Sequence, residues 1–172
     1  MGLKLGKHSF VSPKASIYGD VEVGDNCRID DFCILTGNIK LGNHIHIACF
    51  SFLSGSNGII LEDFSGFAPR TTMLTASDDY KGFSLVSPQV SDKFKPFLER
   101  GKILVKRHAL IGINSVIMPG VTVGEGASVG AYTFINKDLA EWGMYAGVPA
   151  KKIGERNKKM LDLEKEFLSE WN

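Results

Sequence analysis

The 172-residue sequence has few cysteines, no long apolar run and no recognisable export signal. Its three cysteines, Cys27, Cys33 and Cys49, are an odd count, which argues against a disulfide framework and predicts reduced thiols. The longest uncharged run, residues 109–124, contains Asn, Ser, Pro and Gly and is too short to span a bilayer. We therefore expect a cytoplasmic protein without a membrane partner.

Neither sign of charge dominates the sequence. The sequence has 20 Lys and Arg residues and 19 Asp and Glu residues, so its net charge is +1, and it contains no basic block. This balance argues against a nucleic-acid partner. The hydrophobic content of 44% and the length are typical of one soluble globular domain. Glycine, in contrast, is abundant at 19 residues and needs an explanation.

An apolar residue recurs every six positions over most of the chain. These residues are Leu5, Val11, Ile17, Val23, Ile29, Leu35, Leu41, Ile47, Leu53, Leu61, Phe67, Met73, Val105, Ile111, Ile117, Val123, Val129 and Ile135. The frame is interrupted by a two-residue insertion at Ile59 and Ile60 and by a polar segment after Met73. The period fits neither an α-helix nor a single strand, and it predicts the hexapeptide repeat of a parallel β-helix.

Two other positions of the hexad carry information. The fifth position is small or aliphatic and is expected to face inward, so Cys27 and Cys33 are interpreted as packing residues. Cys49 lies at the third position and is expected to be inert. The second position is often glycine, which permits a tight backbone at a corner.

Residues 110–153, "LIGINSVIMPGVTVGEGASVGAYTFINKDLAEWGMYAGVPAKKI", resemble the C-terminal signature of the galactoside, maltose, serine and O-antigen or capsule acetyltransferases. The resemblance extends over residues 5–153. It implies a left-handed parallel β-helix, an all-β solenoid, with acetyl-CoA as co-substrate and a homotrimeric assembly. We expect the β-helix over residues 1–153, an inserted acceptor loop at about residues 78–104, and an amphipathic C-terminal helix over residues 154–172.

The hexads stop between Met73 and Val105, where residues 75–102 contain four aromatic residues and many charges. Long insertions in repeat proteins gather on one face and often bind ligands. We expect this segment to be an arm that reaches over a neighbouring subunit and encloses the acceptor. The alternative is a tolerated surface excursion.

The histidines His44, His46 and His108 occupy outward hexad positions. Histidine suits a general base that removes a proton from an attacking hydroxyl or amine. We take His46 as the first candidate and His44 as the second; the alternative is that both are ordinary exposed residues. His44 and His108 share a column with Phe64 between them, which places them about 10 Å apart, too far to share a metal ion within one chain.

The family's catalytic histidines have no direct counterpart here. Galactoside acetyltransferases begin the loop with histidine, where this chain has "SDDY", and Gly55 stands where serine acetyltransferases have histidine. Asp78 or Asp79 from an adjacent subunit could orient a histidine. If the acceptor is an amine that binds unprotonated, such a carboxylate could suffice, which points to nucleotide-linked amino sugars.

The resemblance also implies that acetyl-CoA lies in a groove between subunits and bonds exposed backbone groups of the later coils. Small residues permit that approach, and lysines could face the CoA phosphates as point charges. The candidate residues are Gly112, Ile113, Gly130, Ala131, Lys151 and Lys152.

The leading prediction is acetyl-CoA-dependent O-acetylation of a saccharide, without a metal. Its alternative is N-acetylation of a nucleotide-linked amino sugar. Two further alternatives are a zinc enzyme of the gamma carbonic anhydrase type, for which three histidines are available, and a β-helix scaffold without catalytic function.

Overall fold

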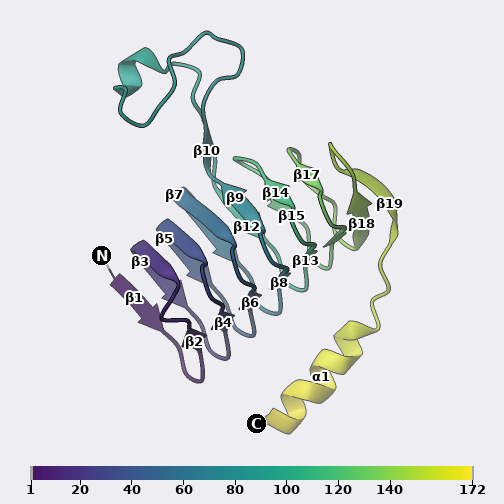
Figure 1. The fold of residues 1–172 in the computed structure, drawn as a ribbon. Helices are drawn as coiled ribbons and strands as arrows, with labels where there is room; N and C mark the ends of the chain where they lie inside the picture. The colour runs from purple at the N-terminus through teal and green to yellow at the C-terminus, as the bar shows by residue number, and fades with distance from the viewer. Residues whose placement is uncertain (1, 172) are drawn as a thin grey trace.

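Each six-residue repeat forms one short strand, and the chain returns to the same face after three repeats. A computed structural model describes residues 2–171. The register shows this spacing, since Phe10 pairs with Arg28 and Arg28 pairs with His46, each eighteen positions later in the next coil. The described chain is a left-handed parallel β-helix with a projecting arm and one helix, as the hexads and the resemblance predicted (Figure 1).

Three faces make up the prism. Face 1 consists of β1 (Gly2–Leu5), the second halves of β3 (Ser16–Val23), β5 (Ile34–Leu41) and β7 (Phe52–Leu61), then β12 (Ile103–Val105) and β15 (Thr122–Val123). Face 2 consists of β2 (Phe10–Val11), β4 (Arg28–Ile29), β6 (His46–Ile47), β8 (Gly66–Phe67), β13 (Leu110–Ile111), β16 (Ser128–Val129) and β18 (Gly143–Ala146). Face 3 consists of the first halves of β3, β5 and β7, then β9 (Thr72–Leu74), β14 (Val116–Ile117) and β17 (Phe134–Ile135).

The three corners between the faces have different compositions. Corner A, between faces 1 and 2, and corner B, between faces 2 and 3, each place one residue per coil in the left-handed backbone region. That residue is at the fourth hexad position and is rarely glycine. In corner A these residues are His8, Asn26, His44, Phe64, His108, Gly126 and Trp142, and in corner B they are Phe32, Phe50, Arg70, Asn114 and Tyr132. Corner C, between faces 3 and 1, bends at glycines and carries the arm.

The interior is filled as the hexads predicted. The first-position residues from Val23 onward and nearly all fifth-position residues are buried, including Cys27 and Cys33. Burial raises the pKa of both of these thiols, which keeps them in the unreactive protonated form. The two cysteines therefore pack the core, and Cys49 is half-buried at corner B.

At Gly112, a second-position glycine, the close approach of the next coil, and not an unusual backbone angle, explains the absence of a side chain. A Cβ atom built on Gly112 would lie 2.7 Å from the backbone of Gly130 and Ala131 in the next coil. Backbone cannot yield as a flexible side chain does, so a Cβ at Gly112 would force these two coils apart.

Gly112→Ala is therefore expected to lower the free energy of unfolding by about 1–3 kcal/mol, the usual cost of overpacking. Gly66→Ala is the matched control, because its Cβ would meet only the Leu110 side chain at an ordinary 3.5 Å. Urea unfolding of both variants measures the difference. Equal midpoints would show that the coils separate without cost.

The arm leaves corner C as a two-stranded ribbon. β10 (Ala76–Ser77) pairs antiparallel with β11 (Glu99–Arg100), and a single 3-10 turn, η1 (Asp92–Phe94), lies near the tip. The arm projects from the solenoid body (Figure 1). Its side chains Tyr80 and Phe83 are 89% and 68% exposed, so the aromatic residues of the arm find little cover in their own chain.

The C-terminal segment differs from the expected helix over residues 154–172. β19 (Lys151–Glu155) first folds back antiparallel on β18, and α1 (Met160–Trp171) begins only afterwards. Arg156 anchors the link, because its Nη1 donates to the carbonyl oxygens of His108 and Gly126. Within residues 2–171, no helix is long and apolar enough to cross a membrane.

Candidate functional site

His44 and His108 belong to a stacked column at corner A rather than to an open site. The Phe64 ring lies between them, with centroids 4.6 Å from His44 and 5.4 Å from His108. The ring of Phe167 on α1 meets His44 and Phe64 edge-on. His108 is only 4% exposed, contrary to the expectation that it faces solvent, because α1 covers it.

Glu164 fastens α1 to this column. Its Oε2 lies 2.8 Å from His108 Nε2, and its Oε1 accepts a short hydrogen bond from Arg107 Nη2. The side chain of Glu164 is 11% exposed, so the carboxylate is nearly buried between its two partners. His108 therefore helps to dock α1. His44 is half-exposed and stacks on Phe64 in the same column, and its catalytic role stays a prediction.

His46 lies on face 2 and forms a pair that the sequence analysis missed. Its Nε2 lies 2.7 Å from Asp30 Oδ2, and Arg28 Nε donates to the other oxygen at 2.6 Å. Burial alone would raise the pKa of Asp30, but the hydrogen bonds from His46 and Arg28 outweigh burial and hold that pKa below its usual value. Because Arg28, Asp30 and His46 are spaced by 2 and 18 positions, the eighteen-residue register could have revealed this cluster.

Corner B holds the residues that were assigned to the cofactor. Gly112 and Gly130 donate their amides to Val129 and Tyr145 of the next coil, so these two N–H groups are occupied. Within residues 2–171, the amides of Ile113 and Ala131 donate to no partner. A row of outward, unpaired backbone donors beside small residues fits an extended amide-bearing arm such as the pantetheine of CoA.

Lys151 and Lys152 are exposed on β19, past the last coil of corner B. Lys152 Nζ lies 2.5 Å from Glu155, whose hydrogen bond raises the pKa of the lysine. Lys151 has no carboxylate within ion-pair distance among the described residues. Of the two lysines, Lys151 is therefore the more available to a phosphate.

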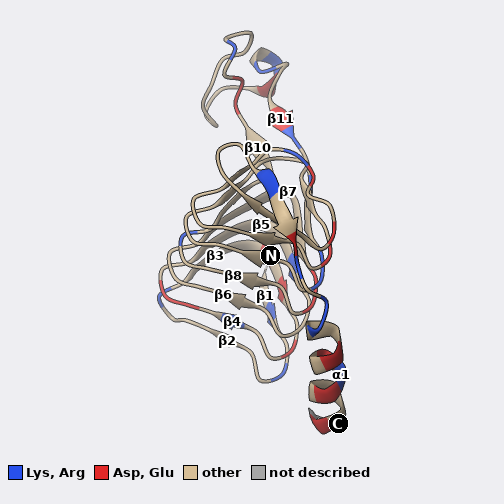
Figure 2. Cartoon of the chain, turned by 90° about the vertical axis from the view of Figure 1, so that its right-hand side faces the viewer, with Lys and Arg blue, Asp and Glu red and all other residues tan. Residues whose placement is uncertain are grey.

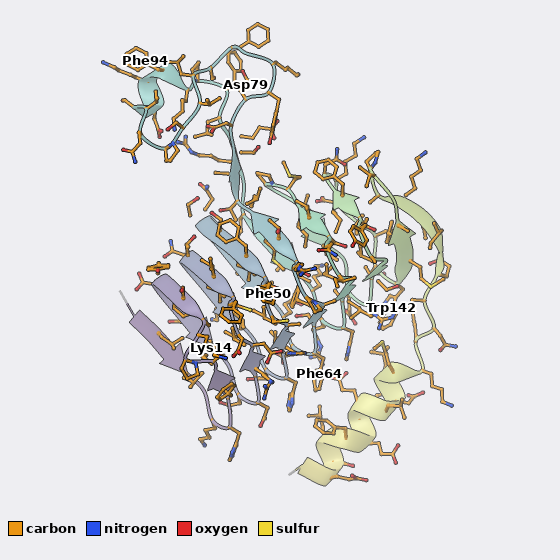
Figure 3. All side chains as sticks on the ribbon, in the orientation of Figure 1. Lys14, Phe50, Phe64, Asp79, Phe94 and Trp142 are labelled. Carbon is orange, nitrogen blue, oxygen red and sulfur yellow. The ribbon has the colours of Figure 1, made fainter. Side chains whose placement is uncertain are left out.

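Asp78 and Asp79 follow β10 directly, where the two-stranded ribbon opens into the loop of the arm, and they accept hydrogen bonds from that loop. Asp79 accepts hydrogen bonds from the amides of Lys81, Phe83 and Ser84, at 2.8, 2.6 and 3.0 Å. The Asp78 carboxylate accepts a hydrogen bond from the Ser87 amide at 3.2 Å. Asp79 stands on the arm, away from Phe50 and Phe64 on the solenoid corners (Figure 3). The chain itself therefore does not bring Asp79 to the histidine column at corner A.

The amide bonds, first of all that from Lys81, hold the pKa of Asp79 below its usual value. The carboxylate therefore orders the arm above about pH 3.9, and that order is lost as pH falls through the lower folded-state value. Asp79→Ala is expected to speed hydrogen exchange at the amides of residues 81, 83 and 84. Asp78→Ala should affect only residue 87. Unchanged exchange at residue 83 would contradict the assignment.

A polar cluster at corner C, which we call the loop root, consists of Ser56, Asn57 and Thr75. Thr75 Oγ1 donates to Ser54 O and accepts a hydrogen bond from the backbone N–H of Asn57 at 3.1 Å. The side-chain Nδ2 of Asn57 donates to Thr75 O at 2.9 Å. These residues flank the two points at which the hexads are interrupted, which is the signal that the sequence analysis overlooked. The cluster offers hydroxyl and amide groups beside Gly55, with no histidine.

The fold agrees with the resemblance to β-helix acyltransferases, and comparisons with known proteins place the chain more closely. The family model described as "Bacterial transferase hexapeptide (six repeats)" matches residues 102–137. The dTDP-4-amino-4,6-dideoxy-D-glucose acyltransferase of Escherichia coli is 34% identical over 173 residues, covering 97% of this chain and 90% of the relative. The chain therefore belongs to the hexapeptide-repeat acyltransferases.

Solved structures agree over the same length. AntD, an N-acyltransferase from Bacillus cereus in complex with dTDP and 3-hydroxybutyryl-CoA, matches with a TM-score of 0.94 and 40% identity, over 97% of this chain and 90% of AntD. A point mutant of AntD, in complex with dTDP-4-amino-4,6-dideoxyglucose and coenzyme A, matches with the same TM-score. WbbJ of Escherichia coli K12, named as an O-acetyl transferase, is 22% identical over 160 residues. The comparisons thus favour the alternative, N-acylation of a nucleotide-linked amino sugar, over the O-acetylation placed first.

The zinc alternative gains no support from the geometry. In the part of the chain that the structure describes, no group of three or more His, Cys, Asp or Glu side chains is placed to hold a metal ion. The His44 and His108 rings lie on opposite sides of Phe64, as the column spacing predicted.

Proposed function

We propose that this protein transfers an acyl group from acyl-CoA to the amine of a nucleotide-linked amino sugar. The observation that carries the proposal is the whole-length similarity to acyltransferases that act on, or are bound to, dTDP-linked amino sugars. The loop root adds support, because hydroxyl and amide groups can orient an amine and no histidine stands among them.

The chemistry needs modest help from the protein. The neutral amine attacks the thioester carbonyl, a new C–N bond forms, the C–S bond breaks, and CoA leaves as the thiol after taking the proton that the amine loses. Orientation of the two substrates supplies most of the acceleration. An amine that binds unprotonated does not require a strong base, so the absence of histidine at the loop root suits this acceptor.

We further propose a homotrimer whose sites lie between chains. Face 3 exposes Ile34 and Phe52, 40% and 36% accessible, and this apolar face suits packing around a threefold axis. Face 3 is bounded by corners B and C, so packing it inward would bring corner B of one chain beside corner C of the next. The CoA edge of one subunit would then meet the loop root and arm of its neighbour.

The roles of the predicted residues follow from this arrangement. Ile113 and Ala131 bond the pantetheine arm, and Lys151 faces the phosphates. Asp78 and Asp79 shape the arm around the acceptor. His46, held by Asp30, borders the same groove from face 2 and remains the candidate proton acceptor if one is used. Acetyl is the simplest acyl group, and the AntD complex with 3-hydroxybutyryl-CoA supports a somewhat larger one. The reduced cysteines favour a cytoplasmic location.

Initial rates with matched acceptors test the proposal. The purified protein is supplied with acetyl-CoA or 3-hydroxybutyryl-CoA and either dTDP-4-amino-4,6-dideoxyglucose or its 4-hydroxy counterpart. We expect kcat/KM for the amine to exceed that for the hydroxyl by about 100-fold or more, because a hydroxyl, unlike a neutral amine, needs a general base to attack the thioester. Equal rates, or transfer to the hydroxyl alone, would overturn it.

A further inference from the structure

The arm joins the solenoid through a narrow neck that consists of β10 and β11. Each of these strands is two residues long, and Figure 2 shows them between the solenoid and the tip of the arm. The tip is held together by its own contacts, since Arg100 on β11 pairs with Asp92 of η1 and Phe83 packs on Phe97. Because these contacts lie within the arm, the direction of the arm relative to the solenoid depends on the residues at the root of the neck.

The two-residue insertion that precedes the arm supplies one of these residues. In the ladder between β5 and β7, residues 56–58 of β7 stand opposite the single residue Asn38 of β5. The extra backbone bulges at corner C and carries Asn57 to Thr75 in the next coil. The insertion and the arm therefore meet at one point, although the sequence separates them by a complete coil.

Asn57 uses all of its hydrogen-bond donors within the loop root. Its backbone N–H donates to Thr75 Oγ1 at 3.1 Å, and its Nδ2 donates to Thr75 O at 2.9 Å and to Ser56 Oγ at 3.1 Å. A carbonyl oxygen can only accept a hydrogen bond, so the bond to Thr75 O fixes which end of the side-chain amide faces it. Thr75 itself is fully buried and donates to Ser54 O at 2.7 Å. Asn57 thus holds a residue that is already anchored in the solenoid.

The returning strand of the neck reaches the same carbonyl oxygen. The N–H of Gly101 donates to Thr75 O at 3.0 Å, so this oxygen accepts from both Gly101 and Asn57. A Cβ atom built on Gly101 would lie 2.4 Å from the backbone nitrogen of Gly120, so the returning strand also lies directly against the following coil. The insertion and both strands of the neck are therefore joined at Thr75.

We infer that Asn57 is a positioning residue, which acts through Thr75 to set the direction in which the arm leaves the solenoid. Its two bonds to Thr75, one to the side chain and one to the backbone, resist rotation of the neck. Supporting contacts of this kind hold a site in its productive geometry. The inference rests on the proposed function, in which the arm encloses the acceptor, and adds the residue that fixes where the arm stands.

Asn57→Ala in the full-length protein tests the inference. Loss of a hydrogen bond that shares its acceptor with Gly101 should speed hydrogen exchange at the Gly101 amide about fivefold or more. We expect kcat/KM for the dTDP-linked amino sugar to fall about tenfold, while KM for acyl-CoA stays unchanged. Asn38→Ala is the matched control, because Asn38 is exposed at the same corner one coil earlier and, within residues 2–171, its side chain makes no hydrogen bond.

The same substitution in a chain without the arm separates positioning from direct contact with the acceptor. When residues 78–98 are replaced by an Asn-Gly turn, Asn57→Ala should leave the residual rate of acyl transfer unchanged, because no arm remains to be positioned. A further fall in that rate would show that Asn57 acts on the acceptor itself, and would overturn the inference.

The outcomes separate the inference from the proposed function. If Asn57→Ala transfers the acyl group to the amino sugar as fast as the unaltered protein does, the inference is overturned and N-acylation stands, whatever happens to exchange at Gly101. If the unaltered protein transfers no acyl group to the amino sugar, the proposed function fails. Exchange at Gly101 then decides the role of Asn57 alone, since faster exchange supports its hold on the neck and unchanged exchange overturns it.

Discussion

Removing the arm is expected to abolish most of the acyl transfer while leaving the β-helix folded. Residues 78–98 can be replaced by an Asn-Gly turn, because Ser77 and Glu99 are paired antiparallel and a two-residue turn closes such a ribbon. We expect kcat/KM to fall by about 100-fold or more, the effect of losing substrate position. The rate with the dTDP-linked amino sugar measures this effect.

The β-helix should tolerate the change because the contacts of the arm are internal. Phe83 packs on Phe97, and Lys95 Nζ donates to Ser87 O. Thermal unfolding is therefore expected to change little. An arm-shortened variant that retains activity within a few-fold would show that residues 78–98 are a surface excursion and would remove the arm from the site.

The second large effect is expected at Glu164. Glu164→Ala should weaken the docking of α1 on the solenoid by about 2–3 kcal/mol. The substitution leaves buried His108 and partly exposed Arg107 without their carboxylate partner. We expect proteolysis after Arg156 to become faster, because α1 leaves the His44–Phe64–His108 column. Limited proteolysis and urea unfolding together measure the change.

Glu166→Ala is the matched control for this prediction, because it removes an exposed carboxylate from the same helix. It should change neither measurement by more than a few tenths of a kcal/mol. If Glu164→Ala behaves like Glu166→Ala, the contacts of Phe167 alone hold α1, and the carboxylate contributes nothing measurable.

The β-helix was predictable because its period is set by core packing. Each first-position residue from Val23 onward must face inward, so a repeat in the sequence reports the interior directly. The C-terminal segment was not predictable at the same level. Whether Lys151–Glu155 continues into a helix or pairs with β18 depends on a strand that lies next to it only after the last coil is built.

The candidate site was predictable only in part, for a related reason. Outward residues are not constrained by the hexad, so the sequence placed His108 in solvent although α1 buries it. It also left His46 without its partner Asp30, since pairing across coils joins residues sixteen positions apart. The corner B backbone stays a predicted region for the cofactor, and only the fold shows which of its amides are already used within the ladder.

The proposed site is shared between chains, with the CoA edge at corner B of one chain and the loop root and arm of the next. Two variants each remove one half of this shared site. Ala131→Trp blocks the CoA edge at an exposed position and leaves the arm intact. The arm-shortened chain keeps the edge and lacks the arm. Each variant alone is expected to be inactive.

Co-expression of the two variants tests the claim most directly. When equal amounts of the two chains assemble at random, about one interface in four over all trimers joins an intact edge to an intact arm, so acyl transfer to the amino sugar should return to roughly a quarter of the unaltered rate. A mixture that stays as inactive as its components, in trimers shown to contain both chains, would contradict a shared site.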